Sequence, residues 1–398
     1  MQAKHIIATI LAAFAAATSH ANGSRLPSQD ALAVARGYAF TASADNLSAI
    51  YFNPAGLAQA TVAEVESGAH FLSPTTSYSG ANGTTANLKS RNFVIPYLYA
   101  GLPLTSVPGA VVGFGVYSPF GLSTDWPVNG PFRTIATHNQ LTFVREVVTF
   151  AYDFRNGLML GGSFQHNSIE AKLNQGVGMM PGDNFGYDGK DSTAWSYDLG
   201  IIWRPAKEHS FGLHYQSNVS FGLKGTVALT PYNFSESGSV NWPFPSDIAV
   251  GYSYRPTPDW NIEVGYDQTN WSSLKTIVLN RSISGPLPLV FNWKDSGYYG
   301  VGFTHYLENW HYSAGLNYSA NSVNDSTWSP SVADYSRWLW NIGAGYKLGP
   351  WTFESVFQWN PSSSRTIHGS PLSAAGQTAD GTYTSKLVGF SFQGSFKW

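Results

Sequence analysis

Residues 36–57 read RGYAFTASADNLSAIYFNPAGL, a stretch with neither the sustained alternation of a strand nor the long apolar stripe of a helix. It ends in Asn53, Pro54, Ala55 and Gly56, which predict a turn. Proline fixes its own φ, biases the preceding residue towards extended geometry, and is followed here by a glycine that permits positive φ. A long series of predicted strands follows. A compact, weakly polar segment ahead of so many strands predicts a plug around which the strands close.

The first 21 residues have the features of a secretory signal peptide. Lys4 and His5 form a basic start, residues 6–17 are an apolar run, and Ser-His-Ala at 19–21 is a small-x-small cleavage site. The apolar run is too short to cross a bilayer as a helix. We therefore expect the mature chain to begin near Asn22, with an uncleaved anchor as the alternative.

The composition differs from that of a soluble domain. Charged residues make up 12% of the chain, about half the roughly 25% of soluble domains, while aromatic residues make up 15% and glycine occurs 40 times. The mean hydropathy is -0.14, which is not unusually apolar. Few charges, many aromatic residues and an average hydropathy together are typical of a membrane barrel, in which apolar residues on the outside and polar residues on the inside cancel in the mean. Cysteine is absent, which excludes disulfides and thiolate metal sites. The net charge of -2 gives no reason to expect nucleic acid as a partner.

From about Thr61 onward, apolar residues alternate with polar or small ones, as they do in strands. One such row is Trp260, Ile262, Val264 and Tyr266, which alternates with Asn261, Glu263, Gly265 and Asp267. Trp and Tyr recur at strand ends, as expected of rings at a membrane interface. The core of a soluble sandwich would not suit so many charged residues on the opposite face.

About fourteen strands are expected, an even number as in bacterial barrels. Their approximate ranges are 61–72, 89–101, 109–118, 139–153, 157–172, 193–204, 209–228, 245–255, 259–279, 290–306, 309–320, 336–348, 350–360 and 384–398. Short linkers alternate with long ones, and the long ones include Leu173–Asp191, Leu229–Phe244, Asn321–Tyr335 and Pro361–Thr384. Short periplasmic turns and long outer loops are the pattern of outer-membrane barrels.

The last strand carries Val388, Phe390, Phe392, Phe396 and Trp398 on one face. An aromatic terminal residue resembles the signal by which outer-membrane barrels are recognised for assembly. The sequence thus predicts an all-β antiparallel transmembrane barrel in the outer membrane of a Gram-negative bacterium. The expected parts are a signal peptide at 1–21, a plug or hatch at 22–60 and the barrel at 61–398. Expected partners are outer-membrane lipid, lipopolysaccharide and the barrel-assembly machinery.

The plug stretch closely resembles the N-terminal hatch of the FadL family, outer-membrane channels that take up long-chain fatty acids and other hydrophobic molecules. The matching residues are Gly37-Tyr38-Ala39, Ala44-Asp45 and residues 50–57. Later blocks also resemble the family: Ser118–Leu122, Phe244–Asp247, Trp271-Ser272 and Asn292–Asp295. The resemblance extends over essentially the whole mature chain.

The resemblance implies passive uptake. A hydrophobic molecule is caught in an apolar groove of outer loops, the hatch shifts, and the molecule leaves sideways through a gap made by a kink in the third strand. Lateral exit avoids moving an alkyl chain through water, at about 0.8 kcal/mol per CH₂. The family includes channels for fatty acids, which are our first expectation, and channels for aromatic hydrocarbons, so the substrate stays open.

The resemblance also points to gating residues. The hatch motif at 53–56 either takes part in gating or is a plain turn that anchors the plug. The third strand contains Gly113 and Gly115, which either form the kink or are ordinary barrel glycines.

Other residues are candidates for substrate binding. Met179, Met180 and Phe185 form an apolar loop that either binds substrate or packs against other loops. Arg145 and Arg337 face inward by parity, and either meet a substrate carboxylate or, as we favour, pair with lumenal acids such as Glu263, Asp267 or Glu354. Lys294 lies in a family-like block and is a further candidate cation.

Two other functions compete with this one. A lipase-type barrel would need a nucleophile, but no Gly-x-Ser-x-Gly elbow occurs and the histidines lack metal-ligand spacing, so we expect no enzyme activity, metal or cofactor. A general hydrophilic porin would need an open lumen, which the plug would block.

Overall fold

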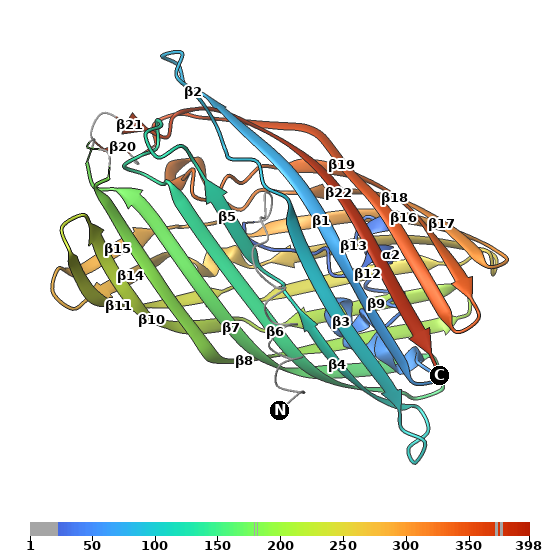
Figure 1. Cartoon of the computed structure of the whole chain (residues 1–398). Coiled ribbons are helices and arrows are strands. Elements are labelled where there is room, and N and C mark those ends of the chain that lie inside the picture. The colour runs from blue at the N-terminus through green and yellow to red at the C-terminus, as the bar shows by residue number, and fades with distance from the viewer. Residues whose placement is uncertain (1–22, 179, 181, 371–372, 375–376) are drawn as a thin grey trace.

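In the computed structural model, residues 23–398 are described, apart from 179, 181, 371–372 and 375–376. The expected signal peptide and Met179 lie outside the described residues. The strands of the barrel (Figure 1) are β1 (Glu64–Ser79), β2 (Thr85–Asn87), β3 (Phe93–Pro103), β4 (Ala110–Tyr117), β5 (Gly121–Asp125), β6 (His138–Asp153), β7 (Leu158–Gly176), β8 (Asn184–Ala206), β9 (His209–Gln216), β10 (Val219–Thr230), β11 (Phe234–Phe244), β12 (Asp247–Tyr254), β13 (Trp260–Thr269), β14 (Thr276–Arg281), β15 (Gly285–Val290), β16 (Ser296–Leu307), β17 (Trp310–Ser319), β18 (Arg337–Leu348), β19 (Trp351–Ile367) and β22 (Gly381–Lys397). Two short strands, β20 (Ser373–Ala374) and β21 (Gln377–Thr378), pair with each other.

These strands close into an antiparallel barrel with 14 positions around its wall, as the sequence predicted. Several positions hold two consecutive strands, such as β4 with β5 and β9 with β10. Closure comes from β22, which pairs with β1 in continuous register from Glu64↔Lys397 to Ser79↔Thr382. A closed wall leaves no strand edge to face lipid without hydrogen bonds.

The predicted alternation is confirmed along the wall. Trp260 and Val264 of β13 are exposed on the outside, while Asn261 and Glu263 between them are buried inside. No helix within the described residues has the length and apolar character needed to cross a membrane.

The expectation of long irregular loops was wrong for three of the four segments. β7 and β8 extend through most of the Leu173–Asp191 segment, β11 occupies most of Leu229–Phe244, and β19 and β22 extend into Pro361–Thr384. Only Asn321–Tyr335 stays largely irregular, with the 3₁₀ helix η3 (Asp325–Thr327). A membrane-spanning strand needs only about 9–11 residues, so the remaining residues of the 23-residue β8 extend the wall beyond the bilayer.

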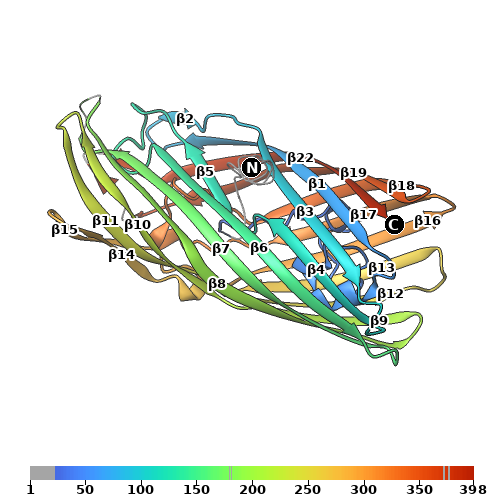
Figure 2. The same ribbon diagram turned by 60° about the horizontal axis from the view of Figure 1, so that its bottom comes forward.

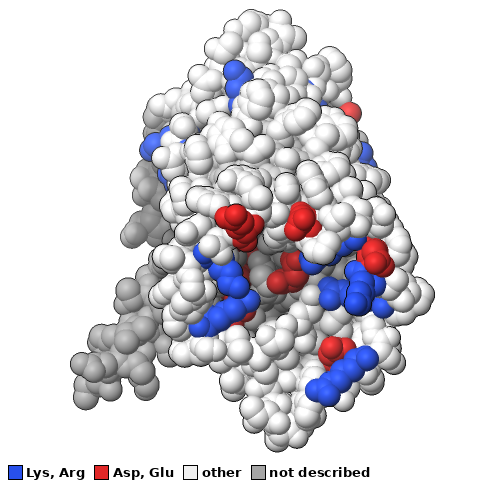
Figure 3. Space-filling view, turned by 90° about the vertical axis from the view of Figure 1, so that its right-hand side faces the viewer, with Lys and Arg blue, Asp and Glu red and all other residues white. Residues whose placement is uncertain are grey.

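Residues 23–60, which we call the lumenal segment, lie inside the barrel (Figure 2). They form three short helices, α2 (Ala31–Ala35), α3 (Ala49–Phe52) and the 3₁₀ helix η1 (Pro54–Gln59); a further one, η2 (Trp271–Ser273), follows β13. Asp30 caps the N-terminus of α2, and its carboxylate accepts a hydrogen bond from the Ala33 N–H at 2.6 Å. Figure 3 shows the short-turn end of the barrel, where acidic and basic side chains gather around a hollow.

Candidate functional site

The barrel interior towards the long-loop end is lined by large apolar side chains, which we call the outer lining. Its buried residues include Tyr78, Leu122, Trp126, Leu141, Ile169, Tyr187, Leu223, Val227, Leu279 and Trp328. They come from β1, β5, β6, β7, β8, β10 and β14 and from the segments after β5 and η3, and they include the parts of β7, β8 and β10 that extend beyond the bilayer. A porin channel has a polar interior. This interior instead offers contacts to apolar solutes.

Within the outer lining, five rings form one cluster: Phe120, Phe143, Phe221, Phe244 and Trp271. Each is at most 4% exposed, and the ring centroids of neighbouring members lie 5.0–5.8 Å apart. Several pairs are edge-to-face, the arrangement that aromatic quadrupoles favour. We call this group the five-ring cluster.

The barrel wall is interrupted beside this cluster. β4 ends at Tyr117 and β5 begins at Gly121, and Pro119 between them has no N–H with which to continue the ladder. β3 pairs with β4 only through Leu98–Pro103, so residues 93–97 of β3 have no described strand partner on this side. β5 pairs with β6 alone. We call residues 93–97 and 118–120 the wall break.

The start of the lumenal segment is bonded to the wall break from inside. Leu26 donates its N–H to the Pro119 carbonyl at 2.8 Å, and Gly121 donates to the Ser24 carbonyl at 2.8 Å, so that Arg25 forms a β-bridge with Phe120. We call this contact the clasp. The lumenal segment thus supplies backbone partners that the neighbouring strand does not.

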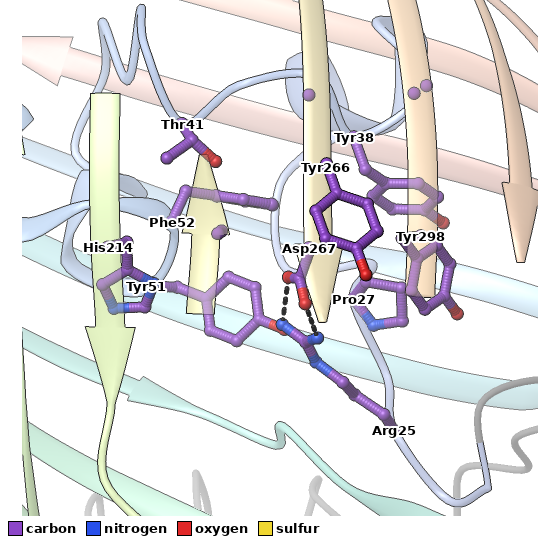
Figure 4. A pocket seen from close by; sticks show the side chains of 14 residues that line it. Arg25, Pro27, Tyr38, Thr41, Tyr51, Phe52, His214, Tyr266, Asp267 and Tyr298 are labelled. Carbon is purple, nitrogen blue, oxygen red and sulfur yellow. Dashed lines mark hydrogen bonds and ion pairs between the residues drawn. The ribbon is translucent and has the colours of Figure 1, made fainter. Parts of the chain in front are cut away.

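Arg25 ties the clasp to the opposite wall (Figure 4). Its guanidinium forms a two-pronged hydrogen bond with Asp267 of β13, with one N–O distance of 2.6 Å, and reaches Asp247 of β12 at 3.4 Å and Thr269 at 2.8 Å. A cavity of about 30 Å³, large enough for one water molecule, lies beside it. A buried, bidentate charge pair of this kind fixes geometry.

The hatch-motif residues lie deeper, against β7 and β8. Asn53 is fully buried; its amide donates to the Thr41 carbonyl at 2.8 Å and to the Ile201 carbonyl at 3.1 Å, and its Oδ1 accepts the Ala55 N–H at 3.2 Å. Pro54 and Gly56 are buried in η1. The fit depends on wall glycines, because a Cβ on Gly200 would lie 2.1 Å from Asn53 Oδ1 and one on Gly161 would lie 2.3 Å from the Pro54 carbonyl carbon.

Other close backbone contacts of the lumenal segment are also made at wall glycines. A Cβ would lie within 2.6 Å of the lumenal segment at each of Gly101, Gly113, Gly161, Gly200, Gly212, Gly300, Gly302 and Gly315. We call these residues the glycine girdle. At these positions the barrel has room for the segment because the wall carries no side chain there.

Gly113 and Gly115 lie in the regular part of β4, paired with Gly101 and Tyr99 of β3 on one side and with β6 on the other. Both face inward. A Cβ on Gly113 would meet Leu57, and one on Gly115 would meet Ile50 and Tyr99. The interruption of the third wall strand comes after Tyr117, beyond both glycines.

Ion pairs hold the lumenal segment at the short-turn end. Asp45 bonds Arg36 at 3.0 Å within the segment and Arg255 at 2.6 Å in the turn after β12. Burial alone would raise the pKa of Asp45, but the two guanidiniums outweigh it and hold the pKa well below its usual range. Asp45 is therefore charged, and it anchors the segment to the wall.

The two inward arginines are buried, as parity indicated, but neither pairs with Glu263, Asp267 or Glu354. Arg145 donates to the amide oxygens of Asn167 at 2.7 Å and Gln216 at 2.8 Å. Arg337 is 3% exposed, lies 5.8 Å from the Tyr335 ring, and its Nε and Nη2 have no hydrogen-bond partner among the described residues. The acids are bound elsewhere: Asp267 by Arg25, Glu263 by the Ala42 and Ser43 N–H groups, and Glu354 by His311.

The remaining candidates lie far apart. Phe185 is half-buried and packs against the outer lining, whereas Met180 is 70% exposed. Lys294 is exposed and lines a polar groove of about 350 Å³ with Asp325 and Arg365. The structure therefore does not bring Lys294 together with Arg145 or Met180 in one pocket.

Sequence reasoning missed the clasp and the five-ring cluster. Pro119, inside a run that otherwise reads as a strand, was a signal for the wall break. The blocks containing Phe120, Phe244 and Trp271 stood out only by resemblance, and nothing local in the sequence marked Arg25.

Fold and site together define a transmembrane β-barrel channel with an apolar outer interior and an internal segment of its own chain. Residues 12–395 match the family model described as "Outer membrane protein transport protein (OMPP1/FadL/TodX)", and the chain belongs to this family. It is 22% identical over 355 residues to the long-chain fatty acid transport protein of Escherichia coli, with 76% of this chain and 78% of that one covered.

Solved structures share the fold. A FadL homologue of Pseudomonas aeruginosa superposes with a TM-score of 0.82 at 15% identity, covering 94% of this chain and 99% of the other. The toluene transporter TbuX of Ralstonia pickettii superposes with a TM-score of 0.71 at 16% identity, covering 95% and 99%.

Family membership gives the general function. The protein is an outer-membrane barrel of a Gram-negative bacterium, in a family of transport channels for hydrophobic compounds rather than of enzymes. Within the described residues, no group of three potential ligands could hold a metal ion.

Proposed function

We propose that the protein is a passive channel for long-chain fatty acids, which enter through the outer lining and leave sideways through the wall break. The observation that carries the proposal is that the outer lining and the wall break are adjacent, because Phe120 belongs both to the five-ring cluster and to the wall break. An apolar chain gains about 25 cal/mol per Å² of surface that it buries against such a lining.

The lumenal segment acts as the hatch in this proposal. An apolar chain that enters the five-ring cluster displaces Phe120, and with it the backbone that bonds Ser24 and Leu26. The clasp then opens, and residues 93–97 of β3 are exposed to the passing chain. The glycine girdle and Asp45 keep the rest of the segment seated, so that only its start moves.

Arg337 supports an acid as the substrate. A buried guanidinium without a carboxylate partner is costly, and an incoming carboxylate would supply charge-assisted hydrogen bonds to its open Nε and Nη2. Arg145 already has amide partners, which makes it the weaker candidate.

The test is uptake of radiolabelled oleate and toluene by cells that lack their own hydrophobic channel and express this protein. Oleate uptake that falls at least about tenfold in an Arg337→Gln variant and little in Arg145→Gln supports the proposal, since a charged hydrogen bond is worth about 1.5–3 kcal/mol. Oleate uptake no higher than in cells without the protein contradicts it.

Uptake of aromatic hydrocarbons is the second candidate, and the five-ring cluster favours it because rings pack well on rings. Toluene uptake without oleate uptake would establish it. Uptake of a polar sugar, together with uptake of neither oleate nor toluene, would point to a general porin.

Contacts with the assembly machinery and with lipopolysaccharide belong to the same proposal. Trp398 is 69% exposed beyond the end of β22, where an assembly factor could reach it.

A further inference from the structure

One acid–base pair lies on the outside of the barrel. Glu146 of β6 and His166 of β7 are direct cross-strand partners, and both face outward because their neighbours Arg145 and Asn167 are buried inside. His166 Nδ1 lies 3.2 Å from Glu146 Oε2, and the side chains are 33% and 43% exposed. The outward residues of β7 beyond His166, towards the long-loop end, are polar as well, so the pair lies where the outer face changes from apolar to polar.

The surroundings of this pair are apolar and exposed. Phe164 is 77% exposed, Trp195 is 67% exposed and Val148 is 57% exposed on the same outer face. The Trp195 ring lies 5.1 Å from the His166 ring. The pair is thus a polar spot bordered by side chains that suit an acyl chain.

Hydrogen bonding orients the His166 ring. His166 Nε2 lies 2.9 Å from the Ser192 carbonyl, which can only accept, so Nε2 carries a hydrogen. The other ring nitrogen, Nδ1, therefore faces Glu146 Oε2.

The backbone is shaped to make this arrangement. The β7–β8 register shifts between Asn167↔Ala194 and Ile169↔Asp191, which leaves Ser192 outside the ladder. Its carbonyl is thereby free to meet His166. Bulges commonly re-aim groups beside functional sites.

The pair also lies next to the wall break. Glu146 is paired with Val116 of β4, one residue before Tyr117↔Arg145, the last β4–β6 pair, beyond which the break begins. A crevice at the break is lined by Leu141, Thr142 and Phe143 of the same strand. A molecule that leaves through the break therefore meets the outward face of β6.

We propose that Glu146 and His166 form a docking site for the carboxyl head group of a fatty acid that has left through the wall break. This inference rests on the proposed function and assigns it an exit site. Among the described residues no hydrogen bond reaches Glu146 Oε1. The fatty acid, which meets Arg337 as a carboxylate, takes up a proton from water on leaving, and Glu146 Oε1 accepts the O–H of the resulting carboxyl group. The acyl chain lies along Phe164 and Trp195. A hydrocarbon without a head group gains nothing from the pair.

The test compares uptake by the wild type with that by a Glu146→Leu/His166→Leu double variant, whose apolar side chains suit a lipid-facing wall. The expected result is oleate uptake about tenfold slower at low concentration and unchanged toluene uptake. Tenfold corresponds to about 1.4 kcal/mol, which is within the range of one ordinary hydrogen bond. A His209→Leu variant, which changes a histidine bonded to Tyr252 on another part of the wall, is the matched control and should keep both rates.

Oleate uptake in the double variant within twofold of the wild type, or an equal fall for toluene, overturns the docking site alone. If the wild type takes up no oleate, the proposed function fails and the docking site fails with it.

A second readout does not depend on transport. A fatty acid with a photoreactive group beside its carboxyl should label β6 and β7 peptides of the wild type in bilayers, and label them several-fold less in the double variant. Equal labelling in both would contradict the docking site.

Discussion

The two halves of the barrel interior are built on the same alternating strands but from opposite residue types. Towards the long-loop end the inward positions carry large rings, such as Phe143 and Phe221. Towards the short-turn end many carry no side chain at all, as in the glycine girdle. The first half offers apolar surface, whereas the second is filled by the chain's own residues 23–60.

This difference separates two tasks. Solute contact falls to the half with rings, and closure falls to the half with glycines, where the lumenal segment packs at backbone distance. The clasp at Ser24–Leu26 lies where the two halves meet. Changes in the half with glycines should therefore alter permeability to polar solutes. Changes in the half with rings should alter the uptake of apolar solutes.

The largest effect is expected from filling the glycine girdle. In a Gly161→Leu/Gly200→Leu variant the new side chains collide with Asn53 and Pro54 and should displace the lumenal segment. The channel should then leak ions, with conductance in planar bilayers at least about tenfold above that of the wild type.

Gly222→Leu is the matched control, because a Cβ there would lie 3.9 Å from Asp191 Oδ2 and meet nothing closer. Wild-type conductance in the double variant would show that the segment does not close the lumen.

The next effect concerns the half with rings. A Phe143→Asn variant places a polar group in the five-ring cluster and removes the burial of one phenylalanine, about 1.5–3 kcal/mol. Half-maximal uptake of oleate and of toluene should both need roughly tenfold more substrate. Val128→Asn, at an exposed loop position, should change neither. Unaltered half-saturation in Phe143→Asn would refute the assignment of the outer lining.

A smaller effect is expected at the clasp. Asp267→Asn removes the bidentate partner of Arg25 but leaves Asp247 and Thr269, so the loss should be below the 3–5 kcal/mol of a fully broken buried pair. The Leu26 amide should exchange hydrogen about tenfold faster, as mass spectrometry of the N-terminal peptides would show. Asp259→Asn, in an exposed turn, should leave the exchange rate as it is.

The smallest effect is a pH dependence within the lumenal segment. Burial raises the pKa of Asp30 to about 6, from an ordinary value of 3.8. The pKa of Asp30 is higher in the folded protein than in the unfolded chain. Asp30 therefore contributes its full stabilisation of the folded state below about pH 4, and this contribution is lost as the pH rises through 6. The Ala33 N–H and the Asn46 amide still bond the ionised carboxylate, which limits the loss.

The rate of backbone amide hydrogen exchange in residues 30–36, divided by the rate expected of an unfolded chain at the same pH, should therefore rise a few-fold between pH 5 and pH 7. An Asp30→Asn variant should show no such rise. The same rise in both proteins would mean that another group titrates.

The wall could be predicted from sequence because each strand carries its own alternation. The alternation around Trp260 and Glu263 shows which residues face outward and which inward without any knowledge of the neighbouring strands. The prediction of long outer loops was wrong for three of the four segments because alternation weakens beyond the bilayer, where the outer face is no longer apolar.

The site could be predicted only in part, because its contacts join distant residues. Arg25 and Asp267 are 242 positions apart, and the five-ring cluster draws on five separate stretches of chain. The arginines show the same limit. The alternation of the strand placed Arg337 inside the barrel, but only the three-dimensional arrangement shows that other groups already bind the lumenal acids.

The most direct test of the account is to lock the clasp. The chain has no cysteine, so a Ser24→Cys/Gly121→Cys variant introduces one defined pair. Facing residues of antiparallel partners lie about 5.5 Å apart, within reach of a disulfide. Oleate and toluene uptake should stop in the oxidised variant and return on reduction, while the two single-cysteine variants transport under both conditions. Full uptake by the oxidised variant would show that substrates do not pass the wall break.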